Sequence, residues 1–456
     1  MARVAGVDSS TQSVKIVVRD SESGALLAQA SRPHPDGTEV DPQHWLDALD
    51  AVIAEIGGLE SLAAISIGGQ QHGMVLLDSA GEVIRPALLW NDTRSAAQAA
   101  AINAAFPDIH QRTGSQLVAS FTASKVRWVL ENEPENAARI AAIALPHDWL
   151  SWKLSGSTDV KEIFTDRSDA SGTGYFDPFN NLYISEILEW VAGKKDVILP
   201  RIVAPGEVGA KVGETLIACG AGDNAGAALG IGAVVGDLII SLGTSGTAFA
   251  VSSSPSHDQS GEVAGFADAT GNFLPLACTL NAAKVFDATA KLLGVGFEEY
   301  SQLALQATPG ADGLMMLPHF DGERTPNRPA AQGSISGITH SNFTPANVAR
   351  ASIEGVIAGL AYAMQALRKE GVEISRLLLV GGAARNKAVQ QITSEIFGMP
   401  VQIPTPGEYV SEGAAIQAAW ALHRRRPQWS SAAMSPLQAE PQPAVVARYL
   451  SEISAI

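Results

Sequence analysis

Two distant stretches of the sequence share one order of elements: a short apolar strand, a turn of small hydroxyl residues and glycine, and a second strand. The first is VAGVDSSTQSVKIVVRD (4–20) and the second is VVGDLIISLGTSGTAFAVSSS (234–254). Helical patterns alternate with strands elsewhere, as in DPQHWLDALDAVIAEIG (41–57), where apolar residues recur at helical spacing. The repeat predicts two α/β halves divided near Val235, each with a Gly/Ser/Thr hairpin directed at a shared cleft. Together the two hairpins would hold one polyanion.

Composition and charge exclude several classes of protein. With 456 residues, of which 46% are hydrophobic and 17% charged, the chain is globular and too long for a single core. Its formal net charge of −16 argues against a nucleic-acid partner, although one pocket could still bind a nucleotide. No segment reaches the ~18 apolar residues of a membrane span, and the start MARVAGVDSS has no apolar leader. Only Cys219 and Cys278 are present, so we expect no disulfide framework and a cytoplasmic, soluble protein.

The two hairpin turns are candidate phosphate-binding elements. No stretch matches G-x-x-x-x-G-K-[ST], which argues against a Walker-type NTPase. Backbone N–H groups and hydroxyls can hold phosphate instead, and the first turn offers Thr11 and Ser13 with Lys15 as a cation. Asp8, at the end of the preceding strand, could hold Mg²⁺ through water. Each hairpin alone could equally be an ordinary polar turn, but matching positions in two similar halves favour phosphate binding.

Two further segments end strands with polar groups. GGQQHG (68–73) supplies Gln71 and His72, which suit hydrogen bonds to a polyhydroxy ligand. LLWNDTR (88–94) supplies Trp90, an apolar platform of the kind that stacks on sugar rings. The alternatives are a structural histidine with satisfied hydrogen bonds and a core tryptophan that precedes a helix.

Two glycine-rich turns complete the candidate set. ACGAGDNAGAALG (218–230) places the carboxylate of Asp223 among small side chains, either as a turn device or beside a ligand that approaches the backbone closely. VGGAARN (380–386) ends a buried strand and opens a helix. Its glycines would let a flat ring or a phosphate lie against the backbone, with Asn386 able to bond a base edge. Such a turn is also common in proteins where it binds nothing.

Taken together, these motifs resemble those of the FGGY carbohydrate kinases, and among them most closely the xylulokinases. The motifs occur in the order of that family: DSSTQSVK, GGQQHG, LLWNDTR, GAGDNAGA, SLGTSG, DGERTP, GSISGITHSNFTPANVARASIEG and LLLVGGAARN. The resemblance extends from Val4 to about Ala421. It implies an α/β fold in which two actin-like ATPase domains of ribonuclease-H type flank a catalytic cleft. Residues 1–235 would mainly bind the sugar and residues 236–456 mainly ATP.

The resemblance also implies roles for individual residues. Asp223 would be the general base that accepts the proton of the attacking hydroxyl while the γ-phosphoryl group transfers in line, and Asp8 the carboxylate near Mg²⁺. The implied sugar contacts are Gln71, His72, Asn224 and Trp90. The implied ATP contacts are Thr11, Ser13, Lys15, Gly243, Thr244, Ser245, Gly381, Gly382 and Asn386.

The implied reaction is phosphorylation of D-xylulose to D-xylulose 5-phosphate with ATP and Mg²⁺, and the family suggests a homodimer. Gln71 stands where xylulokinases often have Met, which leaves another pentulose or a polyol, such as ribulose or arabinitol, as an alternative substrate. The adenosine motif reads GGAARN where GGGARS is usual, and the GERTP loop (322–326) has no assigned role, with Arg324 expected in a structural salt bridge. A non-catalytic, nucleotide-dependent switch of the actin superfamily would need neither Asp223 nor the Gln71–His72 pair.

Overall fold

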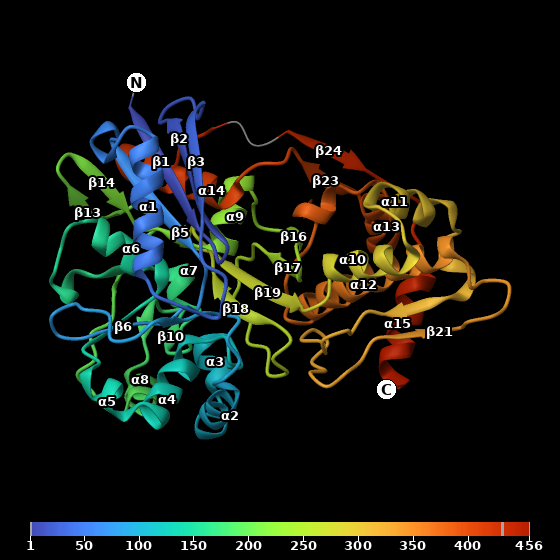
Figure 1. Ribbon diagram of the computed structural model, residues 1–456, viewed down its shortest axis with the longest axis horizontal. Helices are drawn as coiled ribbons and strands as arrows, with labels where there is room; N and C mark the ends of the chain where they lie inside the picture. Colours follow the sequence, from blue (N-terminus) through green and yellow to red (C-terminus); the bar gives the residue numbers. More distant parts are fainter. Residues whose placement is uncertain (1, 430–432, 456) are drawn as a thin grey trace. The chain divides into compact units, whose positions relative to one another are not determined.

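The computed structural model describes residues 2–429 and 433–455, which divide into two compact units (Figure 1). Neither unit is continuous in sequence. Unit 1 contains Met1–Ala233, Gly265–Leu274 and Gly407–Ser431, and unit 2 contains Val234–Ala264, Pro275–Pro406 and Ala432–Ile456. The chain therefore leaves unit 1 near Val235 and later returns to it twice.

Unit 1 is built on a seven-stranded mixed sheet. The strand order is β13 (Val208–Val212), β14 (Thr215–Ala218), β5 (Ala64–Gly69), β1 (Arg3–Ser9), β2 (Ser13–Asp20) and β3 (Leu26–Pro33), with β15 (Ala221–Gly222) also paired to β5. β1 and β2 form the predicted first hairpin, an antiparallel pair in which Asp8 lies opposite Lys15. β1 and β5 run parallel, so their carboxyl ends lie at the same edge of the sheet.

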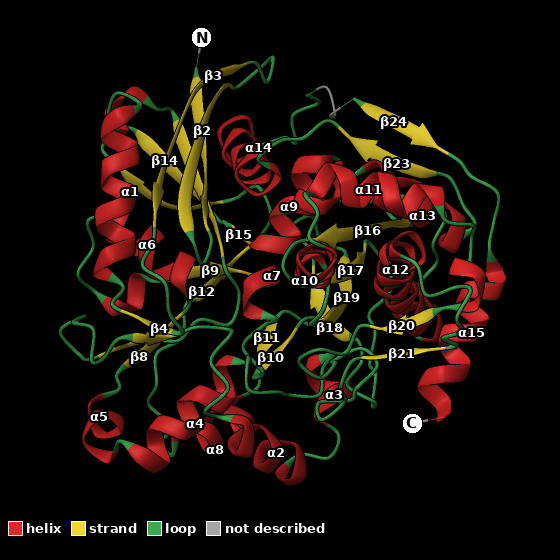
Figure 2. Cartoon of the chain, turned by 45° about the vertical axis from the view of Figure 1, so that its right-hand side comes forward, coloured by secondary structure: helices red, strands yellow, loops and turns green. Residues whose placement is uncertain are grey.

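Helices cover both faces of this sheet, which is why β1 is buried almost throughout (Figure 2). On one face, α1 (Gln43–Glu55) buries Trp45 and Leu49 in a core with the inward side chains of the strands, as its helical pattern predicts. On the other face lies α14 (Tyr409–His423), from the returning segment. It approaches β1 so closely that a Cβ added to Gly6 would lie 1.9 Å from a carbonyl oxygen of α14.

The remaining elements of unit 1 are short. Its other helices are α2 (Ala96–Ala105), α3 (Ile109–Thr113), α4 (Thr122–Asn132), α5 (Pro134–Arg139), α6 (Pro146–Leu154), α7 (Arg167–Ala170), α8 (Ser185–Ala192) and α9 (Asp223–Ile231), with 3₁₀ turns η1 (Leu59–Ser61) and η2 (Val160–Glu162). Its small two-stranded pairs are β4 (Glu39–Val40) with β7 (Ala87–Leu88), β6 (Val75–Leu77) with β8 (Ala142–Ala144), β9 (Phe164–Asp166) with β12 (Arg201–Val203), and β10 (Phe176–Asp177) with β11 (Leu182–Tyr183).

The second seven-stranded sheet belongs mainly to unit 2. Its order is β18 (Ala264–Ala267), β19 (Phe273–Thr279), β17 (Gly246–Ala250), β16 (Asp237–Leu242), β22 (Arg376–Val380), β23 (Val401–Pro404) and β24 (Met434–Leu437). β16 and β17 form the predicted second hairpin, and β16 runs parallel to β22. The arrangement around β16 thus repeats that around β1, with an antiparallel partner on one side and a parallel partner on the other.

A long buried helix organises the core of unit 2. α12 (Pro345–Lys369) begins at Thr344, whose hydroxyl accepts a hydrogen bond from the Asn347 N–H, and Pro345 takes the first helical position. The remaining elements are α10 (Ala283–Leu293), α11 (Phe297–Gln306), α13 (Lys387–Phe397), α15 (Pro443–Ala455), η3 (Ala311–Gly313), η4 (Gly382–Arg385) and the pair β20 (Met315–Leu317) with β21 (Ser334–Ser336). Inside the core, the fully buried Arg350 is neutralised by Glu354 and Glu395.

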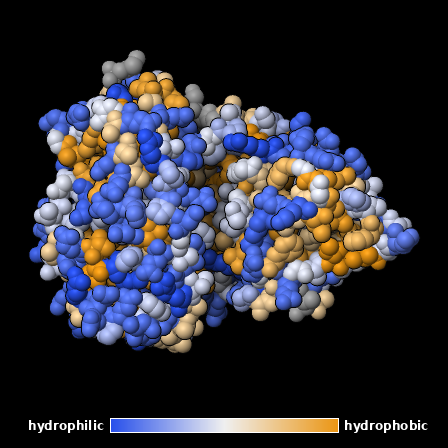
Figure 3. Space-filling model, viewed as in Figure 1, coloured by the Kyte–Doolittle hydropathy of each residue, from blue (hydrophilic) through white to orange (hydrophobic). Residues whose placement is uncertain are grey.

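Hydrophilic side chains dominate much of the surface that Figure 3 presents, with smaller hydrophobic areas between them. Among the described residues, no helix is both long enough and apolar enough to cross a membrane.

Candidate active site

Asp8 and Asp223 lie at the same edge of the unit 1 sheet. In the register of the parallel strands, Asp8 of β1 and Ala221 of β15 both pair with Gly68 of β5. Asp223 follows β15 directly and is the first residue of α9. Since neighbouring strands lie ~4.8 Å apart, the two carboxylates flank Gly68 with backbones roughly 10 Å apart. The edge therefore carries two acidic groups with no side chain on the strand between them.

Asp223 is held through one oxygen and remains partly exposed. Its Oδ1 accepts hydrogen bonds from the backbone N–H of Asn224 (2.7 Å) and from Asn224 Nδ2 (2.8 Å). Its Oδ2 accepts none from the residues that the structure describes. Burial raises the pKa of Asp223 to about 6, against the opposing effect of the two hydrogen bonds. The group is thus ionised at neutral pH and basic enough to accept a proton from a hydroxyl during reaction.

Asp8 is more deeply buried than Asp223, and its pKa is shifted as well. Ser10 Oγ donates a hydrogen bond of 2.5 Å to Asp8 Oδ1. Burial raises the pKa of Asp8 to about 7, and the negative charge of Asp223 adds to the increase, while Ser10 and Lys15 oppose it. Lys15 itself pairs with Glu408 at 2.6 Å, in a contact that is about two-fifths exposed. Lys15 is therefore engaged by Glu408, and among the residues that the structure describes no lysine or arginine forms an ion pair with Asp8.

Gln71 and His72 are fixed by the segment around α7. Gln71 Nε2 donates to the Ser168 carbonyl (2.9 Å), and His72 Nδ1 donates to the Gly172 carbonyl (2.6 Å). His72 has φ of 69°, a left-handed conformation that costs energy for a residue with a Cβ. Its ring packs against those of Phe121 (centroid distance 4.8 Å) and Phe266 (5.5 Å), which also lie against each other. A carbonyl oxygen can only accept, so Nδ1 is the donor in the contact with Gly172.

The main chain at His72 is supported by a buried lysine that sequence reasoning did not single out. Lys125 Nζ donates to the His72 carbonyl (3.1 Å) and to the Ser120 carbonyl, and Thr122 Oγ1 also donates to His72 O (3.1 Å). Complete burial lowers the pKa of Lys125 to about 7. Lys125 therefore stabilises the strained backbone that presents the His72 ring.

Trp90 is joined to the first hairpin by a chain of hydrogen bonds. Its Nε1 donates to Thr11 Oγ1 (2.9 Å), and Thr11 Oγ1 donates to Gln70 Oε1 (3.2 Å). Trp90 is 40% exposed, which makes it a surface platform and not a core residue. The Thr11 hydroxyl is thus hydrogen-bonded to Trp90 and Gln70. Ser13 lies at the start of β2, and its side chain is partly exposed.

In unit 2, the second hairpin and the glycine turn after β22 lie next to each other. Gly243, Thr244 and Ser245 form the turn between β16 and β17, and the carbonyls of Gly243 and Thr244 accept hydrogen bonds from the start of α10. Gly381 has φ of 97°, and an added Cβ would lie 2.5 Å from the Leu242 carbonyl. Only glycine fits at that contact, while Gly382 has open space in the direction of a Cβ.

Asn386 serves as the N-cap of α13. Its Oδ1 accepts hydrogen bonds from the N–H groups of Ala388 (2.9 Å) and Val389 (3.2 Å), and also from Ser301 Oγ (2.9 Å). The side-chain oxygen is therefore committed to the helix start. Any contact between Asn386 and a base edge would use the amide nitrogen.

A buried cluster of charged residues beneath the site was missed entirely from the sequence. His147 Nε2 lies 3.1 Å from Asp169 Oδ2, 3.3 Å from Asp166 Oδ1 and 3.5 Å from Asp148 Oδ1. The His147 and Asp148 pair falls within the apolar run LPHDWLSW, and the other two carboxylates fall in TDRSDA (165–170). Adjacent charged residues inside an apolar run are a signal of paired burial that could have been read.

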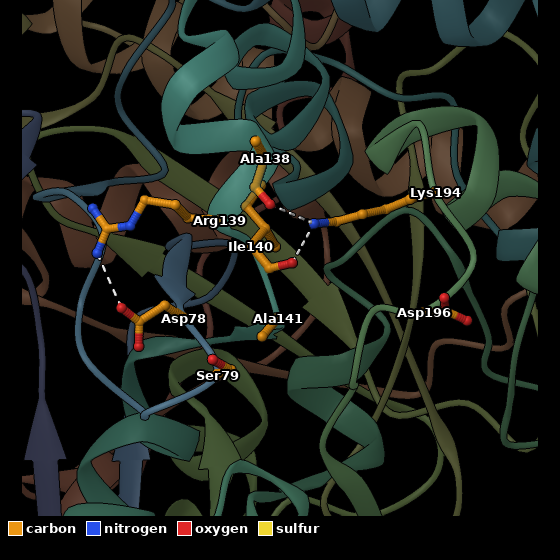
Figure 4. Close-up of a pocket in the computed structure, with 8 residues that line it drawn as sticks. All are labelled: Asp78, Ser79, Ala138, Arg139, Ile140, Ala141, Lys194 and Asp196. Atoms are coloured by element: carbon orange, nitrogen blue, oxygen red, sulfur yellow. Dashed lines mark hydrogen bonds and ion pairs between the residues drawn. The ribbon is translucent and has the colours of Figure 1, made fainter.

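Two other features of the chain lie outside this site. Figure 4 shows a hollow of unit 1 where Arg139 pairs with Asp78 (3.0 Å) and Lys194 Nζ donates to the carbonyls of Ala138 and Ile140. Both of these cations are therefore engaged by the protein. In the GERTP loop, the salt bridge expected for Arg324 is absent among the described residues. Glu323 is the structural group there, accepting hydrogen bonds from Leu280, Asn281 and the Arg324 N–H.

Comparisons with known proteins agree over nearly the whole chain. The N-terminal domain of the FGGY family of carbohydrate kinases matches residues 3–232, and its C-terminal domain matches residues 238–422. The xylulose kinase of Streptomyces coelicolor is 44% identical over 92% of this chain and 88% of its own, and that of Escherichia coli is 34% identical over 91% and 88%. The crystal structure of xylulose kinase from Bifidobacterium adolescentis superimposes with a TM-score of 0.93 at 43% identity, covering 99% of both chains.

Proposed function

The chain belongs to the FGGY family of carbohydrate kinases, and we propose that it transfers the γ-phosphoryl group of ATP to D-xylulose, giving ADP and D-xylulose 5-phosphate. Similarity to xylulose kinases over nine-tenths of the chain supports this choice of sugar. The observation that carries the reaction is the Asp223 carboxylate, which is anchored through one oxygen and partly exposed at the sheet edge. We further propose that the enzyme is cytoplasmic and a homodimer.

Asp223 is the general base of the proposed reaction. Asn224 holds Oδ1, so Oδ2 can face the sugar hydroxyl that attacks phosphorus. As the new P–O bond forms and the bond to ADP breaks, the hydroxyl proton passes to the carboxylate. A pKa of about 6 suits this transfer because the group is ionised at neutral pH yet is a stronger base than an exposed aspartate.

The donor set at Asp8 fits a hydrated Mg²⁺ ion. Mg²⁺ favours carboxylate oxygen and usually keeps several waters, so one or two aspartates suffice. The pKa of Asp8 is raised by burial and by the charge of Asp223, and a nearby cation would offset both. When bound with ATP, Mg²⁺ neutralises charge that develops on the transferring phosphoryl group. The part of Asp8 is to hold that cation at the strand end.

Sugar recognition is assigned to Gln71 and His72 and to the exposed indole of Trp90, all in unit 1. Gln71 and His72 have side chains held in place by hydrogen bonds to backbone carbonyls, which suits contacts with sugar hydroxyls, and Trp90 offers an apolar surface for the carbon chain. Asn224 donates its amide to Asp223, which leaves its Oδ1 as an acceptor for a sugar hydroxyl.

ATP recognition is assigned to the turns of both hairpins and to the glycine turn of unit 2. The groups proposed to bind the triphosphate are backbone N–H groups and hydroxyls, as expected for anion binding without a Walker loop. The residues proposed for ATP are Thr11, Ser13, Lys15, Gly243, Thr244, Ser245, Gly381, Gly382 and Asn386. Gly381, proposed for adenosine, lies against the end of β16, directly before the turn proposed for phosphate. This contact supports placing both parts of the ATP site of unit 2 next to each other.

The test is a coupled ADP-release assay with Mg-ATP and a panel of sugars: D-xylulose, D-ribulose, L-ribulose, xylitol, D-arabinitol and glycerol. We expect the highest kcat/KM on D-xylulose and a loss of ~10²–10⁴-fold in kcat for Asp223→Ala. Preference for another polyol with the same dependence on Asp223 would retain the mechanism and reassign the pocket, beginning with Gln71. Nucleotide binding by a folded enzyme that releases no ADP with any sugar would favour the non-catalytic switch.

A further inference from the structure

The buried cluster of unit 1 brings one histidine and three carboxylates together with almost no access to solvent. His147 and Asp148 begin α6, Asp166 ends β9, and Asp169 lies in α7, and all four side chains are at most 4% exposed. Packing around the ring is tight, because a Cβ added to Gly220 would lie 2.9 Å from both His147 Cε1 and Nδ1. The imidazole is thus locked between the strand ends and the three carboxylates.

The three carboxylates favour the protonated form of the His147 ring. Burial disfavours the imidazolium, but Asp148, Asp169 and Asp166 outweigh that effect and raise the pKa of His147 to about 10. Burial raises the pKa of Asp148 to about 6 and that of Asp169 well above its ordinary value, and Asp223 adds to the increase at Asp169. Arg167 also attracts Asp166 but pairs with Asp268, so loss of the His147 cation would weaken the pairing of these buried carboxylates.

The carboxylates that surround His147 also hold the turn that fixes the catalytic residues. Asp166 Oδ2 accepts hydrogen bonds from Ser168 N (2.7 Å) and Ser168 Oγ (2.5 Å). Ser168 in turn binds both sides of the site: its carbonyl accepts from Gln71 Nε2 (2.9 Å), and its hydroxyl accepts from the N–H of Gly222 (3.0 Å). Gly222 is the residue immediately before Asp223. A continuous path of polar contacts therefore runs from His147 to Gln71 and to the peptide that carries Asp223.

We propose that His147 is a positioning residue, which contacts three carboxylates and holds the Asp166–Asp169 turn so that Ser168 places Gln71 and Asp223 for sugar phosphorylation. This inference rests on the roles proposed above for Gln71 and Asp223. A purely structural ion pair would contribute to folding and leave the kinetics of folded enzyme unchanged. A positioning residue affects the sugar more than ATP, because the atoms that it orders contact the sugar side of the site.

The kinetic test compares two substitutions at one position. His147→Lys keeps a cation on a side chain of similar reach, whereas His147→Gln keeps hydrogen bonding without charge. We expect the Lys variant to stay within about threefold of wild type in kcat/KM for the sugar, and the Gln variant to fall at least tenfold, with KM for ATP changed less than twofold. His44→Gln, an exposed histidine of α1, is the control. A folded Gln variant with wild-type sugar kinetics would overturn the proposal.

Two measurements on the unmodified protein keep the inference testable if the Gln variant does not fold. ¹⁵N NMR of the histidine rings, with the His147 signal assigned by its loss in His147→Lys, should show a doubly protonated ring from pH 6 to pH 9. A ring that loses its proton within this range would refute the cationic form of His147. His147, Asp148 and Asp169 are also close enough to ligate a metal ion, so a stoichiometric transition metal in the purified protein would overturn the proposal as well. Both results are independent of the sugar, so they separate failure of this inference from failure of the proposed function.

Discussion

Replacing Asp223 by Asn is expected to abolish sugar phosphorylation and, at the same time, to stabilise the protein. Burial raises the pKa of Asp223 from 3.8 to about 6. At neutral pH this difference corresponds to about 3 kcal/mol by which the folded protein disfavours the charged carboxylate. Because the side chain is partly exposed, solvent screens part of the cost. We therefore expect Asn, which keeps the Oδ1 acceptor for Asn224, to increase the free energy of unfolding by about 1–2 kcal/mol at pH 8.

The increase in stability should depend on pH in one direction only. The carboxyl loses its proton near pH 4 in the unfolded chain and near pH 6 in the folded protein. The cost of the buried charge is therefore absent below about pH 4 and complete above about pH 6. The difference in unfolding free energy between Asp223→Asn and wild type should fall at pH 5 to about half its value at pH 8.

Urea unfolding of wild type and Asp223→Asn at pH 5 and pH 8, with ADP release assayed in parallel, checks both parts of this prediction. Asp36→Asn, at an exposed aspartate, is the control for a change of charge alone. Destabilisation of the protein by Asn at pH 8 would contradict the raised pKa of Asp223. A difference in unfolding free energy that is the same at both pH values would contradict it as well. A variant that keeps more than about a tenth of the wild-type kcat would refute the role of Asp223 as general base.

At saturating Mg-ATP, kcat/KM for the sugar should fall below about pH 6 as Asp223 takes up a proton, and a pH-independent rate down to pH 5 would contradict this. Gly222→Ala should raise the sugar KM at least tenfold, because the new Cβ would lie 2.8 Å from Gln71 Cγ and Nε2. The control for steady-state kinetics is Gly296→Ala, where the Cβ meets open space. Arg350→Met should lower the free energy of unfolding by about 3–5 kcal/mol, since it leaves two buried carboxylates unpaired, and a loss below about 1 kcal/mol in urea unfolding would refute that estimate.

The sequence predicted those features that depend on short-range pattern. Polar residues directly after apolar strands indicated where Asp8 and Gln71 would lie, and the parallel pairing of β1 and β5 places them at one edge. The repeat of strand, turn and strand indicated two related halves, and the structure has β1 and β16 in equivalent positions of two seven-stranded sheets. These predictions succeed because strand periodicity and turn chemistry are local properties of the chain.

Features that depend on long-range packing were not visible in the sequence. α14 has alanines on all sides and no amphipathic stripe, so its pattern indicates burial but does not identify the sheet of unit 1 as its partner. The ion cluster joins His147 to Asp166, which are separated by a helix and a 3₁₀ turn in sequence. For Asn386, the sequence did not show that its side-chain oxygen caps α13, while its proposed contact with a base edge stays a prediction. In each case the residue type was informative, but the partner was fixed only by the fold.

The small residues around Asp223 illustrate how packing and function constrain the same segment. Gly222 has no room for a Cβ because Gln71 lies against it. Further along α9, a Cβ on Gly230 would lie 2.0 Å from the Tyr409 carbonyl, so the glycine is required where the helix packs on α14. Close packing on both sides therefore accounts for the lack of bulk along α9 without any ligand. Packing does not explain why a partly exposed carboxylate, held by one oxygen, is kept at a cost in stability, and this cost supports the role that we propose for Asp223.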